Sequence, residues 1–273
     1  MVRRGRDLLM VYSLKTRILE NKKILPDFYE MVLSAPAIAA EAVPGQFLMV
    51  KTSPTLVPFL RRPISLSRIN AEEGTITLVY QVVGSGTKLM TVMTPGSEIE
   101  VVGPLGKGFT WSVKDKVVAI VGGGCGIAPL VALTEELLKA GKEVYALLGA
   151  QSRDKLLSDK YFIELGAKVM IATDDGSFGR KGFVTQLLEE VINTTRLDQV
   201  YCCGPLPMTK AVVKLTKEAL VPCQVSLEER MGCGVGACLG CVCKVRSEEG
   251  SLTYKKVCHD GPVFTSSEVI FDD

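Results

Sequence analysis

The hydrophobic pattern of the chain changes in kind near residue 110. Before that point the sequence consists of short β-rich runs broken by glycine and proline, with no sustained helical period. Three such runs are 47–51, 75–83 and 97–102. The middle run alternates, with apolar residues at Ile76, Leu78 and Tyr80, as in a strand with one buried face. Several short strands at this spacing predict a closed antiparallel β-barrel.

After Phe109 the pattern becomes that of an α/β domain. Residues 117–121 form a continuous apolar run, typical of a strand buried on both faces, and a glycine turn and a helix over 129–140 follow. Strands are then expected at 144–148, 169–172, 200–203 and 224–227, alternating with helices at 155–165, 184–192 and 208–220. This alternation predicts a doubly wound parallel sheet. We expect domains at 1–112 and 113–226, and a small cysteine-rich module at 227–273.

Composition narrows the class of protein. The chain has 273 residues, 47% hydrophobic and 23% charged, which is ordinary for a folded protein with a sizeable core. A formal net charge of +2 gives no reason to expect a nucleic-acid surface. No run approaches the roughly 18 apolar residues of a membrane helix.

The start of the chain is weakly basic, with Arg3, Arg4 and Arg6 ahead of a short apolar run. That run is too short for a signal peptide, and no small-residue cleavage site follows it. Nine cysteines without an export signal indicate a reducing compartment, so we expect a cytoplasmic protein with thiols used as ligands or buried.

The cysteines near the end of the chain carry the most specific signal. Cys233, Cys238 and Cys241 stand at C-x4-C-x2-C spacing, and Cys258 follows as a distant fourth, which is the plant-type [2Fe–2S] pattern. Intervening glycines allow the backbone to wrap closely and direct amides at the sulfurs. Structural zinc remains an alternative, although paired C-x2-C units are more typical of it. Cys243 is expected to be a buried thiol on a strand, but it is also placed to ligate instead of Cys241.

Two pieces of the barrel half have residues suited to a flavin nucleotide. In Arg61-Arg62-Pro63-Ile64-Ser65, a guanidinium suits a pyrophosphate and a hydroxyl can bond a flavin ring nitrogen. In Gly84-Ser85-Gly86-Thr87, small residues precede a short helix, where free amides favour phosphate. An ordinary surface turn explains either piece alone.

The α/β half has a phosphate loop. Gly122, Gly123, Gly124 and Gly126 lie between a strand and a helix, an order that lets a nucleotide phosphate approach the backbone. The ends of the later strands, at 149–150, 173–177 and 203–205, are expected around the same crevice. The choice between NAD and NADP stays open. Arg153 and Lys155 suit a 2′-phosphate, whereas Asp174 and Asp175 would repel one.

These motifs together resemble a known family. R-P-I-S at 62–65, G-C-G-I-A-P at 124–129 and C-G-P at 203–205 are similar to the ferredoxin–NADP reductase superfamily. With G-P-L-G-K-G-F at 103–109, D-D-G-S-F-G at 174–179 and the cysteine motifs at 233–241 and 258–264, the chain resembles the electron-transfer subunits of NAD-dependent dihydroorotate dehydrogenase from about residue 12 onward.

The resemblance implies three cofactors and their residues. FAD would be held by Arg62, Pro63, Ile64, Ser65, Val79, Tyr80, Gln81, Gly86 and Thr87. The pyridine nucleotide would meet Gly122, Gly123, Gly124, Gly126, Gly204 and Pro205, and the cluster would take Cys233, Cys238, Cys241 and Cys258. Ser65, near the reactive flavin nitrogen, and Cys203, near the nicotinamide carbon, would be the catalytic residues.

The implied function is oxidoreductase electron transfer in pyrimidine biosynthesis. An FMN-containing catalytic partner, in a two-plus-two heterotetramer, would oxidise dihydroorotate, and electrons would cross the [2Fe–2S] cluster and FAD to NAD+. No nucleic acid or membrane partner is expected. The alternative is the flavin and [2Fe–2S] subunit of an NADH-dependent ferredoxin–NADP transhydrogenase or sulfide dehydrogenase, in which the first cluster ligand is typically aspartate and not a cysteine such as Cys233. A zinc-holding structural module is the third possibility. His259, the only histidine, is either a donor to a cluster sulfur or a solvent-exposed loop residue.

Overall fold

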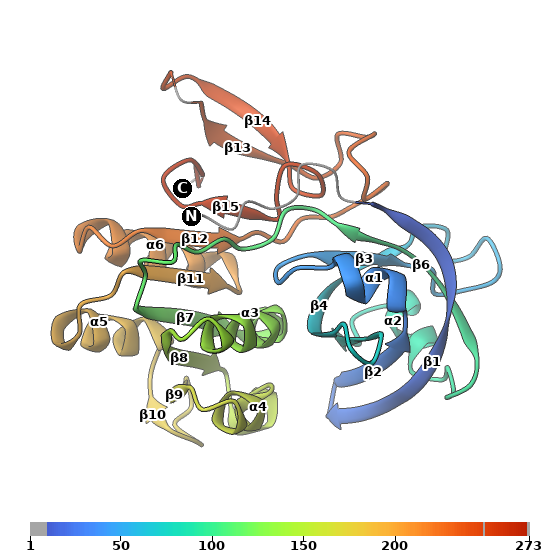
Figure 1. Cartoon of the computed structure of the whole chain (residues 1–273), viewed down its shortest axis with the longest axis horizontal. Coiled ribbons are helices and arrows are strands. Elements are labelled where there is room, and N and C mark those ends of the chain that lie inside the picture. Colours follow the sequence, from blue (N-terminus) through green and yellow to red (C-terminus); the bar gives the residue numbers. More distant parts are fainter. Residues whose placement is uncertain (1–9, 248, 272–273) are drawn as a thin grey trace.

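The computed structural model describes residues 10–247 and 249–271, so the basic residues Arg3, Arg4 and Arg6 lie outside it. A β-barrel and an α/β sheet stand side by side, and the C-terminal segment runs over both of them (Figure 1). Within these described residues, no helix is long and apolar enough to cross a membrane.

The first part of the chain forms the predicted closed barrel, with strand order β1-β2-β5-β4-β3-β6. Its strands are β1 (Tyr12–Leu25), β2 (Phe28–Ser34), β3 (Phe47–Val50), β4 (Arg62–Asn70), β5 (Thr75–Gln81) and β6 (Glu98–Leu105). Two short helices, α1 (Pro36–Glu41) and α2 (Ser85–Met90), lie in the connections. Alternate strand residues such as Leu33, Leu66 and Leu78 fill the interior and are fully buried.

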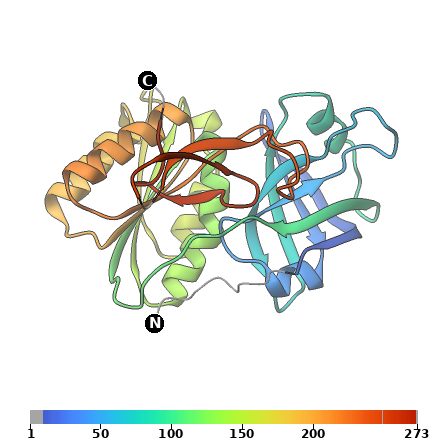
Figure 2. The ribbon, with the colours of Figure 1, turned by 90° about the horizontal axis from the view of Figure 1, so that it is seen from above.

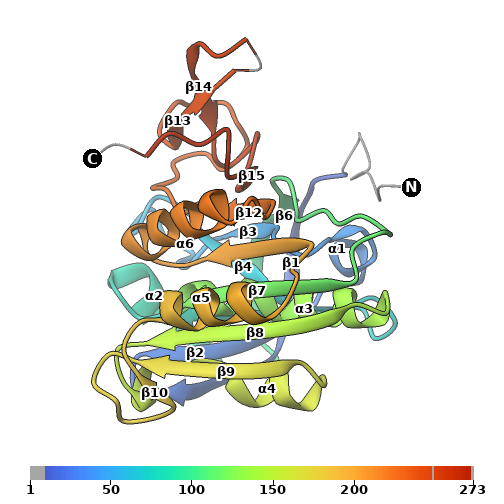
Figure 3. The ribbon, with the colours of Figure 1, turned by 90° about the vertical axis from the view of Figure 1, so that its left-hand side faces the viewer.

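The second part is the predicted parallel sheet, with strand order β10-β9-β8-β7-β11-β12 and a further strand, β15, at its edge. The strands are β7 (Val117–Gly123), β8 (Glu143–Ala150), β9 (Lys168–Thr173), β10 (Arg180–Lys181), β11 (Gln199–Cys203) and β12 (Cys223–Ser226). The helices are α3 (Ala128–Lys139), α4 (Asp159–Glu164), α5 (Val184–Thr194) and α6 (Leu206–Glu218). The first two helices cover one face of the sheet and the last two cover the other (Figures 1 and 3).

One predicted helix is wrong in its extent. The segment expected as a single helix over 155–165 is a 3-10 turn, η2 (Arg153–Lys155), followed by the shorter α4. Leu156 is extended between them, and Leu156 and Leu157 are both buried in the core beneath the sheet. The break lies in the backbone, because Leu156 is extended and Ser158, which precedes α4, has a positive φ of 59°.

The C-terminal segment is tied to the sheet by pairing that the sequence pattern did not reveal. After β12 the chain forms a loop and the hairpin of β13 (Val242–Arg246) and β14 (Leu252–Lys256), which projects from the rest of the molecule (Figure 3). It then returns as β15 (Val263–Thr265), antiparallel to β12. The domain boundaries at 112/113 and 226/227 stay a prediction.

The barrel and the sheet share one apolar core. Phe28 and Val79 of the barrel belong to the same buried cluster as Ile127 and Leu130 of the α/β part. The connecting segment is also fixed, because Thr110 exchanges two hydrogen bonds with the Gln224 side chain, at 3.1 and 2.7 Å. The shared core and these hydrogen bonds hold the barrel and the α/β part side by side (Figure 2).

Leu78→Ala is expected to lower the free energy of unfolding by about 2 to 5 kcal/mol, because it leaves a cavity inside the barrel. Urea unfolding followed by circular dichroism measures this change. Leu56→Ala is the control, since Leu56 is 76% exposed on the same barrel and should shift stability by less than about 0.5 kcal/mol. Equal losses in the two variants would contradict this account of the core.

Candidate functional site

The two flavin motifs predicted in the barrel lie against each other. Gly86, on α2, faces the Arg62 side chain at the start of β4, and a Cβ at Gly86 would lie 2.5 Å from the guanidinium Nε. Arg62 also donates from Nη1 to the carbonyl of Leu60. Only glycine leaves room for the guanidinium in this position. The pair forms a cradle with a fixed positive charge, which fits the phosphates of a dinucleotide.

Several of the other residues predicted to bind the flavin have side chains that are buried or engaged within the barrel, so their backbone groups are what a flavin can contact. Val79 and Tyr80 on β5 are buried, and the Tyr80 hydroxyl donates to Asn21 Oδ1 at 3.0 Å inside the barrel. Burial raises the pKa of Tyr80, so its phenol stays protonated. Thr87 is buried as well, and its hydroxyl accepts from the amides of Val83 and Gly84 at 3.0 and 3.2 Å. Thr87 therefore shapes the loop.

Two glycine loops of the α/β part nest together at the carboxyl ends of β7 and β11. A Cβ at Gly126 would lie 2.5 Å from the carbonyl carbon and oxygen of Cys203, and one at Gly204 would lie 3.0 Å from the Gly123 amide nitrogen. The loops approach at backbone distance. The Met208 side chain packs against both Gly123 and Gly204, and the glycines leave the backbone of this edge open to close approach, as expected for a crevice at a topological switch point.

A group of polar and thiol side chains gathers where the barrel meets this edge. Cys203 is buried, and burial raises its pKa, with the Glu228 charge adding to the effect. Burial, again with Glu228 nearby, raises the pKa of Cys125 to about 12, and the Cys125 sulfur bonds the backbone of Gln81 on β5. Both thiols are neutral at physiological pH. The Gln81 contact links the flavin strand to the phosphate loop.

Glu228 is the residue of this group that the sequence reading missed. It follows β12 by two positions and its side chain reaches solvent, but the protein around it partly desolvates the carboxyl and raises its pKa. Its carboxylate acts electrostatically on both Cys125 and Cys203. A charged residue directly after a buried strand, at the edge where ligands bind, is the signal that would have identified it.

The predicted catalytic residues come from different halves of the molecule. Ser65 lies on β4 opposite Phe47 of β3, half-buried in the barrel wall. Cys203 ends β11 in the α/β part and contacts Ser226 at the end of β12.

The side chains that bear on nucleotide choice are partly occupied. The Arg153 guanidinium donates to Asp159 Oδ2 at 2.7 Å and lies 4.2 Å from the centre of the Phe178 ring. Lys155 donates to Gln151 Oε1 at 2.7 Å. Each basic group thus has a partner within the α/β part, but the guanidinium and the ammonium keep further donors that reach solvent, so these contacts do not decide between NAD and NADP.

The four cysteines predicted as cluster ligands lie together as two pairs. The side chains of Cys233 and Cys238 contact each other, and so do those of Cys241 and Cys258. In residues 10–247 and 249–271, no group of three or more cysteine, histidine or acidic side chains is placed to hold a single metal ion. Two pairs of thiols suit a binuclear cluster, in which each iron takes two thiolates, better than one tetrahedral zinc.

Backbone amides point at these sulfurs. Cys233 Sγ accepts from the Cys238 amide at 3.3 Å, Cys258 Sγ from the Gly236 amide at 3.3 Å, and Cys241 Sγ from the Cys258 amide at 3.4 Å. Burial opposes ionisation of Cys233, but the amides outweigh it and lower the pKa of this thiol to about 6. Burial raises the pKa of Cys258 to about 12. Amides aimed at sulfur are the contacts that tune an iron–sulfur centre.

The neighbours of the cluster loop are also defined. His259 is exposed and its Nδ1 pairs with Asp260 Oδ1 at 3.0 Å, as expected for a loop histidine. Cys243 lies on β13, paired in register with Lys255 of β14, and burial raises its pKa to about 11. Gly234 packs on Met49 of β3, so the loop rests on the barrel.

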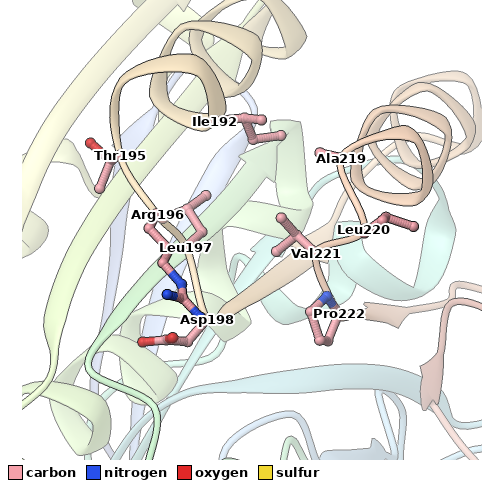
Figure 4. Close-up of a pocket in the computed structure, with 9 residues that line it drawn as sticks. All are labelled: Ile192, Thr195, Arg196, Leu197, Asp198, Ala219, Leu220, Val221 and Pro222. Carbon is pink, nitrogen blue, oxygen red and sulfur yellow. The ribbon is translucent and has the colours of Figure 1, made fainter.

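An open pocket of about 420 Å³ lies elsewhere on the α/β part (Figure 4). It is formed where α5 and α6 end, at the edge of the sheet opposite the glycine loops. Its lining residues are Ile192, Thr195, Arg196, Leu197, Asp198, Ala219, Leu220, Val221 and Pro222. None of them is a predicted site residue, and the Asp198 carboxylate is engaged by the amides of Lys116 and Val117.

Comparison with known proteins agrees with this geometry. Residues 120–214 match the oxidoreductase NAD-binding domain, and residues 228–270 match the iron–sulfur cluster binding domain of dihydroorotate dehydrogenase B. The chain is thus an oxidoreductase subunit that depends on flavin, iron–sulfur and NAD, and its cofactors are FAD, a [2Fe–2S] cluster and NAD.

Curated relatives make the family specific. The chain is 46% identical over 96% of its length to the dihydroorotate dehydrogenase B (NAD(+)) electron transfer subunit of Caldanaerobacter subterraneus subsp. tengcongensis, with 100% of that relative covered. It is 43% identical over 94% of its length to the same subunit of Desulforamulus reducens, with 97% covered. The chain belongs to the family of dihydroorotate dehydrogenase B (NAD(+)) electron transfer subunits.

Solved structures share the fold. An NADH-dependent reduced ferredoxin–NADP oxidoreductase structure matches with a TM-score of 0.82 and 31% identity, covering 93% of this chain and 89% of that one. The cytochrome b5 reductase domain of Ulva prolifera nitrate reductase matches with a TM-score of 0.61 and 17% identity, covering 76% and 93%. The second likeness shows the fold alone.

Gly86→Ala is expected to weaken FAD binding by about tenfold, because the new methyl group displaces the Arg62 guanidinium and its charge-assisted bonds to phosphate. Titration of the FAD-free protein with FAD, followed by flavin fluorescence, measures the dissociation constant. Gly84→Ala is the matched control in the same loop, since a Cβ there meets nothing within 4 Å. Equal affinities in the two variants would exclude the cradle.

Proposed function

We propose that this chain passes electrons from a dihydroorotate-oxidising catalytic subunit to NAD+. The observation that carries the proposal is a paired-cysteine loop resting on a flavin barrel beside a pyridine-nucleotide sheet, in a chain 43% and 46% identical to subunits with that role. When bound, the cluster moves single electrons, FAD converts single electrons to pairs, and NAD+ takes a hydride.

The residues would divide the binding as follows. Cys233 and Cys238 would hold one iron, and Cys241 and Cys258 the other. The Arg62 guanidinium and the β5 backbone would hold FAD, together with the residues predicted beside them, Pro63, Ile64, Ser65, Val79, Tyr80, Gln81, Gly86 and Thr87. The nested loops would hold NAD through Gly122, Gly123, Gly124, Gly126, Gly204 and Pro205.

The side chains at the junction would orient the reacting rings and keep water out. Cys203 is a neutral, buried thiol, so its part is to pack against the nicotinamide and not to attack it. Ser65 would hydrogen-bond the flavin ring from the barrel side. Burial keeps both thiols protonated, and the Glu228 charge beside them adds to that effect. No general base for dihydroorotate is assigned to this chain, so proton abstraction belongs to the partner.

The partner in this proposal is an FMN-containing catalytic subunit, with two copies of each chain in the complex. Leu239, in the cysteine loop, is exposed. That loop rests on β3, and the connection from β3 to β4 exposes Leu56 and Phe59. An exposed apolar rim at a redox centre suits a protein partner, since such patches mark interaction sites. A cytoplasmic location is part of the proposal, because none of the nine cysteines forms a disulfide.

Ferredoxin–NADP transhydrogenase activity is the second candidate. The likeness to the NADH-dependent reduced ferredoxin–NADP oxidoreductase structure favours it, but at 31% identity compared with 43% and 46% for the dihydroorotate dehydrogenase subunits. Purified complex is tested for NAD+ reduction with dihydroorotate and, separately, with reduced ferredoxin. Turnover with ferredoxin alone would overturn the dihydroorotate assignment.

Cys238→Ser is expected to abolish cluster absorption and to slow electron transfer from the catalytic subunit to FAD at least about tenfold, because one iron loses a thiolate ligand. Reduction of the bound flavin by NADH should persist. Stopped-flow absorbance separates the two half-reactions. Cys243→Ser, on β13, is the control and should retain the cluster. Loss of the cluster in Cys243→Ser alone would contradict the ligand assignment.

Leu239→Asp is expected to weaken association with the catalytic subunit by about tenfold or more, because it puts a charge into an apolar contact. Biolayer interferometry with the purified catalytic subunit measures the affinity. Leu220→Asp is the control, since Leu220 is 90% exposed on the α/β part beside the pocket of Figure 4. A stronger effect of Leu220→Asp would place the interface on the other side of the molecule.

A further inference from the structure

A buried carboxylate of the barrel, unused in the function proposed above, is bonded to a helix of the α/β part. Glu30 on β2 is 3% exposed, and its Oε2 accepts from the hydroxyl of Tyr161 on α4 at 3.1 Å. Its other oxygen, Oε1, lies 3.1 Å from Lys22 Nζ on β1. Burying a carboxylate is costly unless it is paired and hydrogen-bonded. The contact between the two parts is therefore specific in its geometry.

Tyr161 is held from several sides by the barrel. The Arg68 guanidinium of β4 lies 5.1 Å from the centre of its ring, within the range of a cation–π contact. The ring also packs against the apolar cluster that contains Phe28, as do Ile24 and Leu25 at the end of β1. Burial and the Glu30 charge raise the pKa of Tyr161, so the phenol remains a donor.

Both residues of this contact neighbour elements proposed to bind the cofactors. Glu30 is paired with Val79 in the β2–β5 ladder, and Val79 belongs to the strand segment proposed to meet FAD. On the other side, α4 begins with Asp159, which binds the Arg153 guanidinium beside the loop that contains Phe178. The Glu30–Tyr161 bond thus joins β2, the neighbour of the proposed flavin strand β5, to a helix of the α/β part.

We propose that the Glu30–Tyr161 hydrogen bond sets the angle between barrel and sheet that hydride transfer requires, and that both are positioning residues. The inference rests on the proposed function. Hydride transfer needs the reacting atoms about 3 to 3.5 Å apart, and a misplacement of about 1 Å far from the chemistry can cost a hundredfold in rate. The apolar cluster holds the two parts together, but it is non-directional, whereas a hydrogen bond fixes an angle.

The first test is Tyr161→Phe in the assembled complex, which removes only the donor. The measured step is NADH + FAD + H+ → NAD+ + FADH2 on the bound flavin, followed by stopped-flow absorbance at saturating NADH. We expect the rate constant to fall about tenfold or more, with FAD and cluster content unchanged. Tyr145→Phe is the matched control, because the Tyr145 hydroxyl contacts Lys168 and Thr195 within the α/β part alone. It should leave the rate within twofold.

Variants of Glu30 separate the hydrogen bond from general packing. Glu30→Gln keeps an acceptor for Tyr161 and should retain the rate, and Lys22 still has Glu20 at 3.0 Å. Glu30→Met has no comparable acceptor and should match Tyr161→Phe. The double variant Glu30→Met/Tyr161→Phe should be no slower than Glu30→Met, since both single variants remove the same Glu30–Tyr161 hydrogen bond.

Hydrogen exchange gives a readout independent of turnover. Amides of α4 and of the turn between β1 and β2 should exchange at least threefold faster than in the wild type in Tyr161→Phe and Glu30→Met. The exchange rates of the same amides should be unchanged in Tyr145→Phe and Glu30→Gln. A rate within twofold of wild type in both Tyr161→Phe and Glu30→Met would overturn the inference, and so would a Glu30→Gln rate as slow as that of Glu30→Met. A wild-type flavin that NADH does not reduce would instead overturn the proposed function.

Discussion

The constraint on which the rest of the structure depends is the apolar contact between the barrel and the parallel sheet. Phe28 and Val79 from one side and Ile127 and Leu130 from the other share a core, and the phosphate loop runs directly into that core. Burying a large apolar side chain contributes about 1.5 to 3 kcal/mol, whereas a hydrogen bond contributes about 0.5 to 1.5 kcal/mol. Burial therefore holds the halves together, and the few polar contacts across the boundary determine orientation.

The same residue type serves two purposes in this protein, and the environment decides which. Around Cys233 the backbone amides favour the thiolate, the form that binds iron. Around Cys125 and Cys203 the apolar surroundings and the Glu228 charge favour the neutral thiol. The pKa alone does not separate the two groups, because burial also raises the pKa of the proposed ligand Cys258 to about 12. The neighbours separate them: Cys258 lies against Cys241 and accepts from the Gly236 amide in the cysteine loop, whereas Cys125 and Cys203 lie at the junction of barrel and sheet.

Local features of the sequence predicted a large part of this arrangement. The strand, glycine turn and helix at 117–139 and the spacing of Cys233, Cys238 and Cys241 are set by neighbours in the chain, so pattern alone indicates them. Contacts between distant positions were out of reach. Nothing near Gly86 indicates that the Arg62 side chain fills the space beside it, and nothing near Glu30 indicates Tyr161. Glu228 was missed because the two thiols on which its charge acts, Cys203 of β11 and Cys125 of η1 (Gly124–Ile127), are remote from it in sequence.

The pairing of β15 with β12 has a consequence for cooperativity. The proposed cluster ligand Cys258 lies between β14 and β15, and β15 pairs with β12, which in turn pairs with β11 in the parallel sheet. Opening of this sheet edge would displace the segment that carries Cys258, so local unfolding of the edge and loss of the proposed cluster are coupled.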